Sequence, residues 1–152
     1  MTARISLREL TKDNWEAVAK LEVRDDQSNF VAPNVYTIAE TRFHPGSRCR
    51  VVFADHHLVG FAAYGIDPDD KQLWLHRFMI AADHQRKGFG RAALKALVAE
   101  WERDYPDAAV VYLSYTPVNA DAERLYLSEG WIPGEMAEWG ERIAVRQLRN
   151  SE

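Results

Sequence analysis

The stretch from Leu73 to Trp101, LWLHRFMIAADHQRKGFGRAALKALVAEW, decides the fold of this chain. Its first part, Leu73–Ile80, is mostly apolar and predicts a buried strand. After a short loop, apolar residues recur at helical spacing and predict an amphipathic helix. These residues are Leu94, Leu97, Val98 and Trp101. The stretch therefore predicts a strand, a loop and a helix, and its least common residues stand in the loop.

Two glycines and three basic residues stand where this helix should begin: Arg86, Lys87, Gly88, Gly90 and Arg91. Glycine costs about 1 kcal/mol relative to alanine inside a helix, so packing alone does not explain the pair. The first turn of a helix has unpaired N–H groups and a partial positive charge. The missing side chains at 88 and 90 leave those groups open, which predicts a site for an anion.

The segment Gln85–Gly90 resembles the Gln/Arg-x-x-Gly-x-Gly/Ala signature of the GNAT superfamily of N-acetyltransferases. It matches neither the Gly-x-x-x-x-Gly-Lys-Ser/Thr of P-loop proteins nor the glycine pattern of dinucleotide-binding folds. The resemblance implies acetyl-CoA as co-substrate, with its pyrophosphate held at the start of the helix. The residues that this implies are Gln85, Arg86, Lys87, Gly88, Phe89, Gly90 and Arg91.

The rest of the chain predicts the elements of the same fold. We expect one α/β (α+β) domain over residues 1–152, with a mixed central sheet of about seven strands and about four helices. The expected order is strand, two helices, three strands, helix, strand, helix and two strands. Within the superfamily, residues 58–65, 74–80 and 119–131 look most like the diamine, spermidine and spermine acetyltransferases.

Composition excludes several other classes. The net charge of −4 argues against nucleic acid as a partner and favours a cationic one. No apolar run reaches the roughly 20 residues of a membrane span, and Met1–Ile5 has no signal-peptide core. Cys49 is the single cysteine, so a cytoplasmic protein is expected. His56 and His57 lie at an expected hairpin tip without ligand spacing, so no metal is predicted.

His76 is the candidate general base. It stands in an otherwise apolar strand beside Arg77, where an unpaired polar group would be costly. Its ordinary pKa near 6.5 suits a base at neutral pH. The resemblance places an acidic residue here in the polyamine enzymes, so this chain departs from the pattern. His76 can act directly, act through water or contact the substrate; the alternative is a core histidine bonded to a backbone carbonyl.

A second pair of candidates follows on the last predicted helix. Asn119 and Tyr126 are seven residues apart and project from similar sides of that helix. The resemblance implies that Tyr126 protonates the departing CoA thiolate and that Asn119 contacts the pantetheine arm. It also implies backbone hydrogen bonds to pantetheine from Phe78, Met79 and Ile80, where two central strands splay apart. The alternative is that Tyr126 is a core aromatic residue on the face of Ala122 and Leu125.

The acceptor is expected to be a small primary amine, a polyamine or diamine, acetylated by direct transfer. The candidate substrate-binding residues are Glu22, Asp25, Asp26, Tyr36, Glu40 and His76. The carboxylates among them can equally be solvated helix ends. Aminoglycosides, amino acids and protein amines stay open as acceptors, as does a non-catalytic acetyl-CoA-binding module. Trp139, expected to be exposed in the last hairpin, suggests a homodimer.

Overall fold

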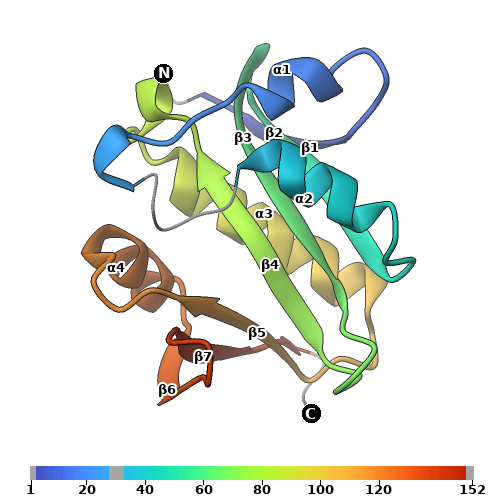
Figure 1. The fold of residues 1–152 in the computed structure, drawn as a ribbon, viewed down its shortest axis with the longest axis vertical. Coiled ribbons are helices and arrows are strands. Elements are labelled where there is room, and N and C mark those ends of the chain that lie inside the picture. Colours follow the sequence, from blue (N-terminus) through green and yellow to red (C-terminus); the bar gives the residue numbers. More distant parts are fainter. Residues whose placement is uncertain (1–2, 28–32, 150–152) are drawn as a thin grey trace.

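The computed structural model describes residues 3–27 and 33–149, which form a seven-stranded sheet with helices on both faces (Figure 1). The strands are β1 (Ile5–Glu9), β2 (Ser47–Ala54), β3 (His57–Ile66), β4 (Leu73–Ile80), β5 (Val110–Tyr115), β6 (Ile132–Met136) and β7 (Arg142–Gln147). The helices are α1 (Trp15–Ala19), α2 (Asn34–Thr41), α3 (Phe89–Asp104) and α4 (Ala120–Ser128), with 3-10 turns η1 (Asp25–Gln27) and η2 (Ala82–His84). The predicted fold class and element order are confirmed.

The centre of the sheet is split. The strands follow the order β1-β2-β3-β4-β5-β7-β6, and among these described strands only the neighbours β4 and β5 run parallel. Their pairing is confined to Leu73 with Val111 and Trp74 with Tyr112. Beyond these pairs the two strands diverge, as Figure 1 shows. The side of β4 that faces β5 therefore presents backbone N–H and C=O groups to an opening instead of to a neighbouring strand.

A β-bulge marks the point of divergence. Ala63 of β3 pairs with Arg77, but the next residue, Tyr64, pairs with Leu75. His76 is the extra residue between these pairs. A bulge redirects the side chain of the extra residue and ends regular pairing, so the bulge places His76 where β4 leaves β5.

The two faces of the sheet are covered by different helices. Along β2, Cys49 and Val51 pack with Val18 of α1, while Val52 on the opposite face packs with Ala93 of α3. This alternation is the two-residue period of a strand. The larger cluster joins α3 and α4 to β4, β5 and β7, and includes Leu94, Leu97, Trp101, Tyr126 and Trp131. Across the described ranges, no helix is both long and apolar enough to cross a membrane.

Candidate active site

The divergence of β4 and β5 opens a cavity of about 410 Å³, called here the reaction cavity. Its lining includes His76 from the β4 bulge, Asn119 at the start of α4 and Tyr126 two turns later. Asn34 of α2 closes one side, and its Nδ2 donates to the carbonyl of Val18 at 2.9 Å. The cavity thus collects side chains from both halves of the split sheet.

A second cavity, of about 570 Å³, adjoins the first and is called here the donor cavity. Phe78, Met79, Asn119, Ala122 and Tyr126 line both cavities. The donor cavity then runs along Ile80 to the loop before α3. A long, thin ligand can therefore lie on that loop and extend into the reaction cavity.

Gly88 stands at the entrance of this path. It lines the donor cavity, has φ of 82° and caps α3, whose first backbone bond joins the Ala92 amide to the Gly88 carbonyl at 3.1 Å. A Cβ at this position would meet no described atom within 4 Å. The backbone angle thus favours glycine, and the space beside it is open. Gly90 has a packing role as well, because a Cβ there would lie 3.2 Å from Leu125.

The other residues of the loop divide between the cavity and the core. Gln85, Arg86 and Arg91 line the donor cavity. Gln85 is also a structural link, since its Nε2 donates to the Ile80 carbonyl at 2.8 Å and to Gln27 of η1 at 2.9 Å. Arg91 pairs at 3.2 Å with the buried carboxylate of Glu129.

Lys87 and Phe89 differ from these three residues, because neither is among the residues that line the donor cavity. Lys87 is exposed. Phe89 packs on the cluster of β2, β3 and α3 residues around Val52 and Val59. The part of Phe89 available to an anion is therefore its backbone N–H, in the first turn of α3.

On α4, the two predicted residues reach the same space. The Asn119 side-chain oxygen accepts from the Ala122 amide at 3.3 Å and so caps the helix, which leaves its amide group for a ligand. The Tyr126 side chain is buried, and its hydroxyl has no hydrogen bond to another described residue although it lines both cavities. Burial, with Glu141 nearby, raises the pKa of Tyr126 above its usual value near 10.

His76 is half-buried, and burial is the main reason why its pKa is lowered below 6.5. Asp67 and Glu40 act in the opposite direction, while Arg77 and His44 reinforce the lowering. The imidazole is therefore neutral at pH 7 and can accept a proton. It also lines two side cavities, one beneath α2 and one beside the β6–β7 hairpin.

The acidic candidates are spread over two regions. Glu22, Asp25 and Asp26 are exposed on the connection between α1 and α2, whose neighbouring Arg24 and Gln27 line the donor cavity. They thus lie on the donor side. Of the proposed carboxylates, Glu40 is the one that shares a cavity with His76.

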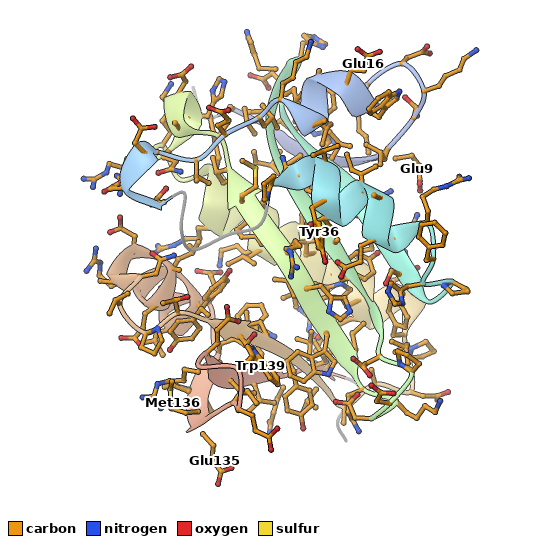
Figure 2. All side chains as sticks on the ribbon, in the orientation of Figure 1. Glu9, Glu16, Tyr36, Glu135, Met136 and Trp139 are labelled. Atoms are coloured by element: carbon orange, nitrogen blue, oxygen red, sulfur yellow. The ribbon has the colours of Figure 1, made fainter. Side chains whose placement is uncertain are left out.

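Tyr36 lies on the outer face of α2 and is 59% exposed (Figure 2). Arg24 and Glu141 also line the cavities and were not predicted. Arg24 crosses the donor cavity to pair with Asp121 at 2.7 Å, and Glu141 lines the reaction cavity. Neither belongs to a recognisable sequence pattern, since each reaches its position through tertiary contacts.

No group of three or more His, Cys, Asp or Glu among the described residues is placed to hold a metal ion.

Comparison with known proteins agrees with this geometry. Residues 8–131 match the model of the acetyltransferase (GNAT) family. The chain is 31% identical over 151 residues to the spermine/spermidine N(1)-acetyltransferase of Bacillus subtilis (strain 168), covering 95% of this chain and 99% of that protein. The chain belongs to the acetyltransferase (GNAT) family. It is an acetyl-CoA-dependent N-acetyltransferase.

Solved structures share the fold at low identity. An aminoglycoside acetyltransferase bound to coenzyme A superposes with a TM-score of 0.78 at 15% identity, over 97% of this chain and 96% of that one. Spermidine N-acetyltransferase from Vibrio cholerae, in complex with CoA and spermine, gives 0.71 at 17% identity, over 93% and 92%. Acetyl-CoA fits this site, because the space beside Gly88 is open and the donor cavity leads from there to the reaction cavity. In addition, no described side chain caps the first amides of α3.

Proposed function

We propose that this enzyme transfers the acetyl group of acetyl-CoA directly to a primary amine of a polyamine or diamine. The observation that carries the proposal is that His76 and Tyr126 line one cavity, at the end of the donor cavity. A base and a proton donor thus lie on either side of the place where a thioester would end. The curated relative named for spermine and spermidine supports the choice of acceptor.

His76 has the role of general base. Holding a lysine-like amine neutral at pH 7 costs about 4 kcal/mol, because its pKa is about three units higher. A positioned base typically contributes about 10²- to 10⁴-fold. His76 is neutral at this pH and takes the proton, directly or through one water, as the amine nitrogen bonds to the acetyl carbon. The proton then leaves His76 for solvent.

Tyr126 supplies the second proton. With its pKa raised above 10, the hydroxyl is protonated at neutral pH. It therefore carries a proton for the departing thiolate as the carbon–sulfur bond breaks. The products are an acetamide and the CoA thiol, so one proton taken by His76 is balanced by one given by Tyr126. A proton from solvent then restores Tyr126.

The path of the donor follows the loop and β4. The amides at the start of α3, with Arg86 and Arg91, bind its diphosphate. The open side of β4 from Phe78 to Ile80 offers backbone hydrogen bonds to pantetheine, since β5 does not occupy it. The Asn119 amide group faces the same path from α4. These placements orient the thioester toward His76.

A screen of acceptors tests the function. Spermine, spermidine, putrescine, aminoglycosides, amino acids and lysine peptides are compared by release of the CoA thiol. We expect the highest kcat/KM with a polyamine or diamine. Turnover of another class alone would contradict the acceptor but leave the enzyme class intact. Acetyl-CoA binding without turnover of any amine would favour a non-catalytic module.

Two further features are proposed here. We infer a homodimer, supported by exposed Ile132 and Met136 on the edge strand β6. Light scattering of the purified protein tests it, and a monomer at all concentrations would contradict it.

The single cysteine, Cys49, supports a reducing, cytoplasmic location. Localisation of the tagged protein in its own cells tests that proposal.

A further inference from the structure

We propose that the cavity between β4 and the β6–β7 hairpin binds the second ammonium group of the acceptor, with Glu141 as its counter-ion. This inference rests on the proposed polyamine function and goes further by assigning selectivity for an amine with two cationic ends. The cavity measures about 360 Å³ and is called here the hairpin pocket. The lining residues used below are Asp67, Trp74, His76, Ser114, Trp139 and Glu141.

The hairpin pocket is continuous with the reaction cavity. Leu75, His76, Arg77, Ser114 and Glu141 line both. His76 is therefore the point from which one acceptor can extend, with its reacting nitrogen in the reaction cavity and its other end toward the hairpin. A flexible chain of methylenes can follow this path.

Glu141 is oriented by two hydrogen bonds, and among the described residues it has no cationic partner. Its Oε1 accepts from the Ser114 hydroxyl at 2.7 Å and from the Trp139 indole N–H at 3.2 Å. Within residues 3–27 and 33–149, no Lys, Arg or His side chain forms an ion pair with it. A carboxylate held in this way presents a negative charge that a ligand ammonium can neutralise.

Two tryptophans complete the pocket. Trp74 is fixed by stacking on Tyr112, with ring centroids 5.2 Å apart, and by donating its indole N–H to Asp70 at 2.9 Å. Trp139 is 62% exposed and lies on the hairpin (Figure 2). Indole faces attract alkylammonium groups and also cover methylenes. A carboxylate that shares a pocket with two indoles therefore matches an aliphatic amine that carries a charge.

The competing position is the cavity beneath α2, of about 330 Å³, which also reaches His76. It contains Glu40, the sequence-predicted carboxylate. However, the Arg77 guanidinium is turned toward this side and lies 3.8 Å from the Glu40 carboxylate. Arg77 also lines the hairpin pocket, but the carboxylate with which it pairs is Glu40. Among the described residues, Glu40 thus already has a cationic partner, whereas Glu141 has none. The charge distribution favours the hairpin pocket.

The test compares spermidine with 1-aminobutane, which has a primary amine but no second charge. The readout is selectivity, the ratio of the two kcat/KM values. We expect Glu141→Gln to lower this ratio roughly fivefold to tenfold, mainly through KM for spermidine. Trp139→Ala, on an exposed side chain, should lower the ratio in the same direction. Glu135→Gln is the matched control, because Glu135 lies on the same hairpin and points away from the molecule (Figure 2).

Each outcome bears on the proposal. Equal losses of kcat/KM with both amines would assign Glu141 a structural role and overturn the subsite. A fall in selectivity with Glu40→Gln instead of Glu141→Gln would place the second ammonium beneath α2 and overturn it as well. An active wild-type enzyme whose Glu141→Gln variant keeps its selectivity overturns the subsite alone. A wild-type enzyme inactive on every polyamine and diamine overturns the proposed function and the subsite with it.

Discussion

His76 and Tyr126 line one cavity although they belong to opposite halves of a split sheet. His76 is the bulge residue of β4, and Tyr126 lies on α4, the helix that follows β5. Their meeting depends on the short pairing between β4 and β5, which ends at Trp74 and Tyr112. The same divergence that opens the cavity therefore places the proposed base and the proposed acid on one cavity.

Loss of the base should change the pH profile as well as the rate. We expect His76→Gln to lower kcat/KM by about 10²-fold. The pKa of His76 is lowered below 6.5, so the wild-type enzyme loses its base form as the pH falls through that value. In a plot of log kcat/KM against pH, the wild-type curve should therefore become steeper at a pH below 6.5, where His76 is protonated. The curve of the variant should follow only the ionisation of the amine. Identical profiles would exclude His76 as the titrating base.

Loss of the acid should slow turnover without abolishing it. For Tyr126→Phe we expect kcat to fall by about 10- to 10²-fold with little change in stability, since the hydroxyl bonds no other described residue. A CoA thiolate is a fair leaving group without help. The raised pKa of Tyr126 predicts that wild-type kcat has no loss from tyrosine ionisation up to about pH 10. Tyr112→Phe is the control, and unchanged kcat in Tyr126→Phe would refute the role.

Gly88 lies at the proposed anion site, and Gly140 in the β6–β7 hairpin is its matched control. Both have positive φ, 82° and 90°, and both face open space. Alanine at either position should cost about 1 to 2 kcal/mol of folding free energy through backbone strain. Only Gly88→Ala should also raise the Kd for acetyl-CoA, by about tenfold, because its methyl group covers the amides. Calorimetric titration measures this, and equal affinities in the two variants would contradict the assignment.

A buried ion pair joins the sheet to α3, and removing one of its partners should be strongly destabilising. Arg50 contacts Glu100 at 2.9 Å, and the Tyr64 hydroxyl donates to the same carboxylate, which is 4% exposed. Removing one partner of such a pair leaves an uncompensated charge and costs about 3 to 5 kcal/mol. Arg50 keeps Glu9 at 2.9 Å, so we expect the lower end for Glu100→Ala. Urea unfolding measures the change in the free energy of unfolding. The control is Glu16→Gln, at an exposed position on α1 (Figure 2), which should change this free energy by no more than about 0.5 kcal/mol. A similarly small change for Glu100→Ala would contradict the prediction.

The fold was predictable because its strongest determinants are local. The helical spacing of Leu94, Leu97, Val98 and Trp101 and the apolar run of β4 each specify one element. The glycine pair at 88 and 90 further specifies the start of α3. These patterns need no knowledge of distant residues.

The site was predictable only in part, because its remaining members meet through strand pairing. The bulge at His76 arises from its register with β3, which no pattern in β4 reveals. Glu141 reaches the cavity because β7 pairs with β5, setting Arg142 opposite Tyr115. By contrast, Glu22, Asp25 and Asp26 were grouped by charge, and the chain places them toward the donor side.

The most direct test is a crystal structure of the enzyme with CoA and spermine. We expect the diphosphate on the backbone amides of residues 88–91 and the sulfur between His76 and Tyr126. We also expect an amine nitrogen within hydrogen-bond reach of His76 or of one bridging water. Phosphates bound away from Gly88, or an amine on the far side of β4 from His76, would contradict it.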